Sequence, residues 1–149
     1  MFLAFRIAEI GTDMDQFPDE QHLAAWAGVC SSQNESAGKR KSGKTKKGNS
    51  NIKKTLVIAA NSAAQTKDTY LSAQYKRISA RRGAKKAKVA VAHTIVKICY
   101  FMIRDGTRYK DLGSDYFDKR DKQGIVLRSI RRIKSLGFDV VVTPRHDIA

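Results

Sequence analysis

The segment between residues 84 and 104 repeats its apolar residues at a helical interval, and no other feature constrains the fold as strongly. Each apolar residue follows the previous one by three or four positions, in the series Ala87, Val91, Ile95, Ile98 and Met102. This interval places all of them on one face of an α-helix. Gly83 and Gly106 flank the repeat, and glycine commonly marks a helix end. The pattern predicts a long helix over residues 84–104 with one buried face.

Shorter segments on either side also predict helices. Apolar residues recur at the same interval within residues 51–66 (Ile52, Leu56, Ala59, Ala60 and Ala63) and again before Gly83 (Leu71, Tyr75 and Ile78). The expected N-caps of these two helices are Asn49 or Ser50, and Asp68 or Thr69. A last helix is predicted over residues 122–136. The Tyr- and Asp-rich segment before it predicts a loop.

The first 28 residues predict a pair of helices. Residues 2–10 read as helical, and residues 11–19 form a turn rich in Gly, Asp and Pro. Asp19 is the expected N-cap of a second helix that Gly28 ends. Two helices joined by a short hairpin can contact the DNA backbone through exposed amides. An ordinary helix pair accounts for the pattern equally well.

Residues 29–48 lack any apolar period and consist largely of Ser, Gly and Lys, so they predict a mobile loop. The predicted fold is therefore all-α, with a helix-hairpin-helix-like N-terminal part, a basic Gly/Ser/Lys loop and about four further helices. We expect a single domain over residues 1–149, with its parts in the order 1–28 helical hairpin, 29–48 basic loop, 49–137 helical core and 138–149 tail.

The charge of the chain points to an anionic partner. Lys and Arg number 29 against 14 Asp and Glu, a net charge of +15. Nucleic acid is the first candidate and an anionic membrane surface the second. The most apolar run, residues 89–103, contains His93 and Lys97 and is shorter than the roughly 18 apolar residues that suggest a membrane span. The two cysteines are far apart and lack a CxxC partner, which disfavours a disulfide scaffold or a zinc site and suits a reducing cytosol.

The basic residues fall into three clusters. The loop cluster is Lys39, Arg40, Lys41, Lys44, Lys46, Lys47, Lys53 and Lys54; the Gly83 cluster is Lys76, Arg77, Arg81, Arg82, Lys85, Lys86 and Lys88; the third is Arg128, Arg131 and Arg132. Such residues bind phosphates without reading sequence. Each cluster alone is equally compatible with a solvated surface. Together, with few acidic residues nearby, they favour nucleic-acid binding.

The loop also raises the question of a nucleophile. Its stretch "NESAGKRKSGKTKKGN", residues 34–49, places Ser36 and Ser42 among cations and three glycines, Gly38, Gly43 and Gly48. Glycine lets backbone approach a phosphate, and the cations would neutralise charge during phosphoryl transfer. Composition alone favours a flexible tether instead. The Walker A spacing is absent, which excludes a P-loop NTPase, and no carboxylate cluster predicts a metal site.

Longer stretches carry a resemblance to a known family. The order of "AEIGTDMDQF", "HLAAWAG", "NESAGK" and "KKGN", followed by the Ala-rich helix, "RRGAKKAKVAVAH" and "LRSIRRIKSLGFDVVVTP", spans nearly the whole chain. It resembles the C-terminal domain of bacterial insertion-sequence transposases of the "IS one-ten" type. The chain departs from the usual pattern at Ser31, where the family often has Pro.

The resemblance implies a mechanism and partners. Ser36 of the "NESAG" stretch matches the family's nucleophile, which attacks the DNA backbone, while Gly38, Gly43, Gly48 and Asn49 match other recurrent positions. The family adds an N-terminal acidic domain that holds divalent metal, expected to be Mg²⁺. It also implies a structured guide RNA, a dimer that pairs into a tetramer on DNA, and a cytoplasmic, nucleoid-associated location. No membrane partner and no cofactor within this chain are expected.

The expected acidic domain has no counterpart in residues 1–149, so we expect this chain alone to be inactive. Two readings stay open. The chain is the serine-bearing part of a split transposase, or it is a catalytically inert remnant that only binds nucleic acid. A basic ribosome-associated or chromatin-type protein is a third candidate, which leaves the order of the "NESAG" residues unexplained.

Overall fold

The computed structural model describes residues 10–11, 13–31, 34–42 and 44–144, with only the backbone of residues 34–36 and 39–42. The helix predicted over residues 2–10 lies outside this range except for Ile10. The chain divides into two compact units, residues 1–114 and 115–149, where the sequence predicted one domain. Each unit is described by itself. The predicted all-α class is confirmed.

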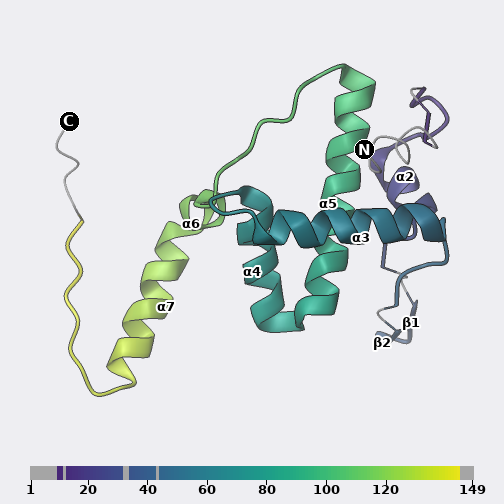
Figure 1. Ribbon diagram of the computed structural model, residues 1–149. Helices are drawn as coiled ribbons and strands as arrows, with labels where there is room; N and C mark the ends of the chain where they lie inside the picture. Colours follow the sequence, from purple (N-terminus) through teal and green to yellow (C-terminus); the bar gives the residue numbers. More distant parts are fainter. Residues whose placement is uncertain (1–9, 12, 32–33, 43, 145–149) are drawn as a thin grey trace. The chain divides into compact units, whose positions relative to one another are not determined.

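The first unit is built around one long helix. Helix α5 (Ala84–Asp105) contacts α2 (Glu20–Trp26), α3 (Ser50–Gln65) and α4 (Tyr70–Arg82). In Figure 1, α4 and α5 form a helical hairpin that turns at Gly83, and α3 crosses both. The core lies where α2 and α3 meet α5. Its fully buried side chains include Leu23, Ala60, Val91 and Val96.

The predicted helix ends are confirmed by local hydrogen bonds. Asp19 accepts from the amides of Gln21 and His22 at the start of α2. Asn49 accepts from the amides of Asn51 and Ile52 at the start of α3, and Thr69 accepts from Ser72 at the start of α4. Gly106 ends α5 with a φ of 64°, a left-handed conformation that glycine adopts without a steric penalty.

The buried face of α5 differs from the predicted stripe. Its buried residues are Ala87, Val91, Ala92, Val96 and Tyr100, whereas Ile95, Ile98 and Met102 are only partly buried. The reason is that α5 packs against three helices, so its contact surface is wider than a single stripe. The Tyr100 hydroxyl donates to the Phe17 carbonyl oxygen at 3.2 Å and ties α5 to the turn before α2.

The prediction of a loop over residues 29–48 is wrong in its middle. Strands β1 (Asn34–Ser36) and β2 (Lys39–Ser42) pair antiparallel and, among the described elements, contact only each other. Ala37 and Gly38 join them with φ values of 51° and 72°. Positive φ at both central residues is the mark of a type I′ turn, which matches the twist of a two-residue hairpin. Backbone pairing therefore forms this hairpin without any apolar alternation.

The second unit contains α6 (Tyr116–Arg120) and α7 (Lys122–Lys134). Helix α7 matches the predicted last helix within two residues at its end. The short helix α6 falls within the predicted loop. Its single turn is too short to show a period, which is why the sequence did not reveal it.

Candidate nucleic-acid interface

A cleft of about 830 Å³ lies between α4, α5 and the segments that flank the hairpin. The C-terminal part of α4 contributes Ile78 and Arg82, and the N-terminal half of α5 contributes Lys85, Lys86 and several residues up to Thr94. Val29, Ser31, Lys44 and Thr45 line it from the chain on either side of the hairpin. Residues far apart in the sequence therefore form one surface.

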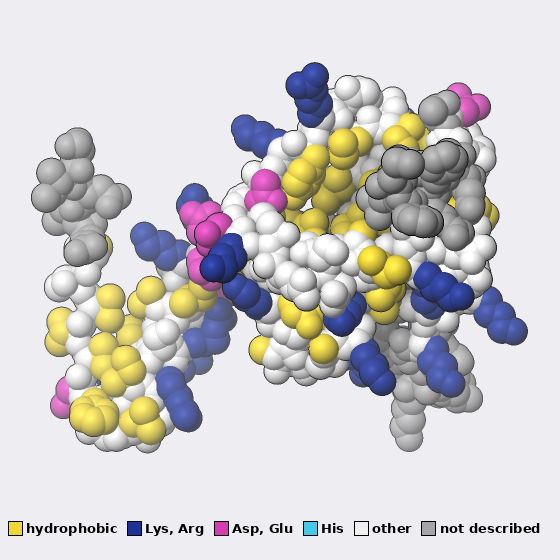
Figure 2. Space-filling model, viewed as in Figure 1, with side chains coloured by type: hydrophobic (Ala, Val, Ile, Leu, Met, Phe, Trp, Pro, Cys, Tyr) yellow, Lys and Arg dark blue, Asp and Glu magenta, His cyan; other side chains and the backbone are white. Residues whose placement is uncertain are grey.

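The cleft joins the two basic clusters that the sequence showed separately. Lys44 belongs to the loop cluster, and Arg82, Lys85 and Lys86 belong to the Gly83 cluster. All of them are exposed. Figure 2 shows Lys and Arg side chains along the lower edge of the first unit, with acidic side chains away from that edge. A concave, cationic surface of this kind attracts phosphate.

A polar pair lies deeper in the cleft. The Gln74 Nε2 group donates to Thr94 Oγ1 at 2.9 Å, and the Thr94 hydroxyl donates to the Ala90 carbonyl oxygen at 3.3 Å. Because the single Thr94 proton is used on Ala90, the atom of Gln74 that faces Thr94 must be the amide nitrogen. This leaves Gln74 Oε1 as a buried acceptor without a hydrogen-bond partner among the described residues.

His93 also lines the cleft. Burial lowers the pKa of His93 below its usual value, the positive charge of Lys97 lowers it further, and Glu20 opposes them. Lys97 and Glu20 form an ion pair at 3.0 Å that joins α5 to α2. The pKa of Glu20 is lowered chiefly by its hydrogen bond with Lys97. Because the pKa of His93 is lowered, the neutral form of its imidazole is favoured in the free protein.

The chain that leads to the hairpin is fixed to the end of α2. Ser31 and Thr45 form an isolated antiparallel bridge, and the Lys46 amide donates to the Cys30 carbonyl oxygen at 3.1 Å. The Asn49 amide donates to the Trp26 carbonyl oxygen at 2.8 Å. The base of the hairpin is thus anchored beside the cleft.

Gly48 makes this anchoring possible. A Cβ atom on Gly48 would lie 2.5 Å from the Gly28 nitrogen and 2.5 Å from the Trp26 carbonyl oxygen. Both are backbone atoms and cannot move aside like a flexible side chain. The sequence predicted close approach of a phosphate at Gly48, but the structure places this residue against backbone.

Comparison with known proteins relates part of the chain to a family. Residues 3–76 match the model of the Transposase IS116/IS110/IS902 family. The match covers just under half of the chain, so this part is similar to that family. No curated protein and no solved structure matches the chain. The resemblance seen in the sequence is confirmed over this range, which ends within α4, and beyond it the resemblance stays a prediction.

The matched segment includes the hairpin, α3 and the first half of α4. The family indicates a role in transposition and DNA as a partner. Ser36 is the last residue of β1, pairs with Lys39 and directly precedes the turn. The motif residue Gly38 lies in that turn, Asn49 caps α3, and Gly43 lies outside the described residues.

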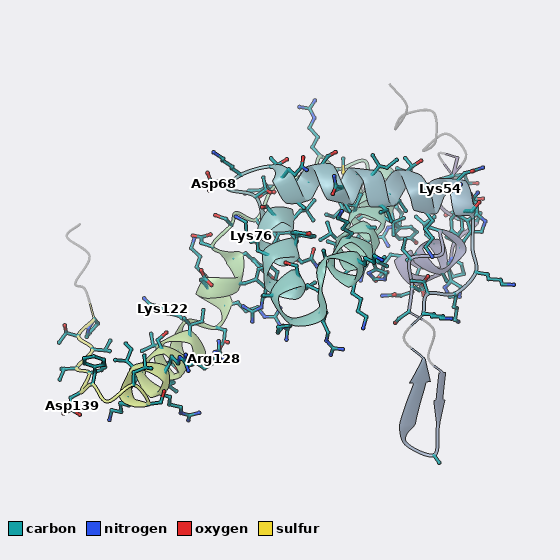
Figure 3. The ribbon with its side chains drawn as sticks, turned by 60° about the horizontal axis from the view of Figure 1, so that its bottom comes forward. Lys54, Asp68, Lys76, Lys122, Arg128 and Asp139 are labelled. Atoms are coloured by element: carbon teal, nitrogen blue, oxygen red, sulfur yellow. The ribbon has the colours of Figure 1, made fainter. Side chains whose placement is uncertain are left out.

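The other predicted DNA contacts of this chain are spread more widely. Lys39, Arg40 and Lys41 lie on β2. Lys46, Lys47, Lys54 and Arg81 are exposed but do not line the cleft. Lys53 donates to Thr45 Oγ1 at 2.5 Å. Figure 3 shows Lys54 at the end of α3 nearest the hairpin and Lys76 on α4. The third basic cluster belongs to the second unit, where Arg128 pairs with Asp121 at 2.8 Å.

The sequence did not single out Gln74 or Thr94. They are twenty residues apart and carry no motif, and only the packing of α4 against α5 brings them together. His93 is one of three histidines scattered along the sequence. Its position in the cleft likewise depends on the packing of the helices.

The described part of the chain includes side chains of the kinds that could hold a metal ion. Within it, no three His, Cys, Asp or Glu side chains lie close enough to hold a metal ion. Likewise, none of the helices described is long and apolar enough to cross a membrane.

Proposed function

We propose that this chain is the DNA-binding, serine-bearing part of an insertion-sequence transposase. The observation that carries the proposal is the cationic cleft beside the anchored base of the hairpin on which Ser36 lies. Lys44 in the cleft is two residues beyond the end of β2. A DNA strand bound along Lys44, Arg82, Lys85 and Lys86 would run close to that hairpin. Other cations near the hairpin would extend the contact to neighbouring phosphates.

In the proposed reaction, Ser36 is the nucleophile. Its hydroxyl oxygen forms a bond to the scissile phosphorus, the bond from phosphorus to one deoxyribose oxygen breaks, and that sugar oxygen takes up a proton. The serine proton passes to a base or to water. The cations nearby would stabilise the extra negative charge on the phosphoryl oxygens as it develops. The product is a phosphoserine linkage, which a later strand can attack in turn.

The remaining partners follow from the family resemblance. In this proposal a separate acidic domain, which the family resemblance implies, would hold the divalent metal. A structured guide RNA and assembly from dimer to tetramer belong to the same proposal. The expected setting is the bacterial cytoplasm, close to the nucleoid.

A second candidate is a remnant that binds nucleic acid and catalyses nothing. The basic cleft would serve such a remnant equally well. The two functions share the cleft and differ in the role of Ser36.

A strand-transfer assay with supplied acidic domain distinguishes them. Ser36→Ala should abolish strand transfer, because it removes the hydroxyl group that acts as the nucleophile. DNA affinity should stay within about twofold, because the substitution removes no charge. Ser42→Ala, in the same hairpin, is the matched control and should retain activity. Strand transfer that survives Ser36→Ala would exclude the nucleophile role, and no strand transfer by the unaltered chain would support the remnant.

A further inference from the structure

The cleft between α4 and α5 has the size of a site for one nucleotide. Its volume of about 830 Å³ falls in the range of pockets that bind one small ligand. A duplex presents phosphates on a broad convex surface, and pairing covers the Watson–Crick edges of its bases. A nucleotide that is unpaired can instead place its sugar and base inside a pocket.

The chemistry of the walls changes from the rim inward. The rim carries Arg82, Lys85 and Lys86, which are exposed cations. No side chain caps the first turn of α5, to which Lys85 and Lys86 belong. Deeper in the cleft, Ile78 and Val89 are partly buried apolar residues. This order suits a nucleotide, with the phosphate at the rim and the flat, weakly polar base within.

The unpartnered oxygen of Gln74 adds a specific acceptor. A buried acceptor that lacks a donor is destabilising, and Oε1 is such an atom among the described residues. Its own amide nitrogen is committed to Thr94, so the side chain cannot turn to relieve it. Every nucleobase carries an N–H group on its pairing edge, which is free only when the base is unpaired. Such a donor can satisfy Oε1 once the side chains that cover it move aside.

We propose that this cleft binds one unpaired nucleotide of a nucleic-acid strand, with its phosphate among Arg82, Lys85 and Lys86 and its base edge donating to Gln74 Oε1. The inference rests on the proposed nucleic-acid binding and narrows its substrate. Single-stranded DNA and single-stranded RNA share this chemistry.

The test uses the full chain and labelled oligonucleotides at fixed salt. The probes are a DNA duplex, the same duplex with one bulged adenosine, the same bulge without its base, and the bulged strand made as RNA. The unaltered chain should bind the adenosine bulge about tenfold more tightly than the perfect duplex or the abasic bulge, the factor that one hydrogen bond of about 1.4 kcal/mol provides. An advantage for DNA, RNA or both assigns the source of the nucleotide, and each supports the proposal.

Three variants distinguish an unpaired-nucleotide site from general nucleic-acid binding at the cleft. Gln74→Met removes the acceptor and keeps the side-chain length, so it should abolish the advantage of the bulge while duplex affinity and thermal stability stay nearly unchanged. Lys85→Gln with Lys86→Gln should weaken binding of every probe, and Lys67→Gln, an exposed cation outside the cleft, should weaken it least.

Equal affinity for the bulged, abasic and perfect duplexes, or an unchanged preference in Gln74→Met, would overturn the unpaired-nucleotide site and leave the proposed function standing. If the double lysine variant bound every probe as well as Lys67→Gln, the cleft would not be the nucleic-acid interface. Both proposals would then fail.

Discussion

At the scale of single residues, close backbone contact explains one motif position better than ligand binding does. Gly48 lies against Gly28 and Trp26 where the hairpin segment meets α2. Gly48→Ala should lower the free energy of unfolding by about 1–3 kcal/mol, since backbone must shift to admit the methyl group. Chemical denaturation followed by circular dichroism measures the change.

Gly38→Ala is the control for that substitution. Gly38 has a positive φ of 72°, unlike Gly48, and no atom of the described residues lies within 4 Å of an added Cβ. Only the left-handed conformation then opposes the methyl group, at a cost of roughly 1–2 kcal/mol that is confined to the hairpin. A global destabilisation by Gly38→Ala as large as that by Gly48→Ala would contradict the steric explanation.

The position of His93 in the cleft predicts that stability and DNA affinity depend on pH. Its lowered pKa in the free chain means that the neutral imidazole is favoured by folding, so stability is lost as pH falls below the unfolded value of about 6.5. A bound anion favours the protonated ring, and binding should therefore take up a proton. DNA affinity should rise as pH falls from about 8 to 6, by several-fold.

Titration of affinity against pH in two variants checks this effect. His93→Gln should flatten the profile. His22→Gln, an exposed histidine on α2 outside the cleft, should keep the slope of the unaltered chain. If the affinity of His93→Gln still depended on pH as strongly, the proton taken up on binding would belong to another group.

At the scale of elements, the hairpin carries local strain at Ala37. This residue has a φ of 51°, which is unfavourable for a residue with a Cβ atom, whereas Asn tolerates it and is preferred in type I′ turns. Ala37→Asn should stabilise the hairpin by about 0.5–1 kcal/mol. Slower amide hydrogen exchange on β1 and β2, with no change in α5, is the expected result. Faster exchange would show that the turn is of another type.

The elements also show which features the sequence could predict. Helices α2 to α5 and their caps were predictable because the signals are local: Asp19, Asn49 and Thr69 each accept from amides within three residues. The hairpin was missed because its order depends on two positive φ values and backbone pairing, which leave no apolar period. The buried face of α5 was misplaced because three helices pack against it.

Only the basic residues of the candidate site could be predicted from the sequence. Lys44, Arg82, Lys85 and Lys86 were all named as DNA contacts from the sequence, but in separate clusters. Their convergence depends on tertiary packing, as does the position of Gln74 beside Thr94. The sequence therefore predicted that the site is positively charged, but not how its residues are arranged in space.

At the scale of the whole molecule, the net charge of +15 predicts binding that depends strongly on salt. If the chain makes about 6–10 phosphate contacts, its affinity for DNA should fall about a thousandfold or more between roughly 50 and 200 mM salt, because counterions released from DNA drive binding. Fluorescence anisotropy over this salt range measures the slope. A flat response would contradict a phosphate-binding interface.

Covalent trapping tests the central claim most directly. The chain is mixed with labelled element-end DNA and guide RNA, with and without a supplied acidic domain, and the products are separated on a denaturing gel. Our account predicts a protein–DNA adduct that requires the acidic domain, persists in Ser42→Ala and is lost in Ser36→Ala. No adduct with the acidic domain present, or an adduct that survives Ser36→Ala, would contradict the role of Ser36 as the nucleophile.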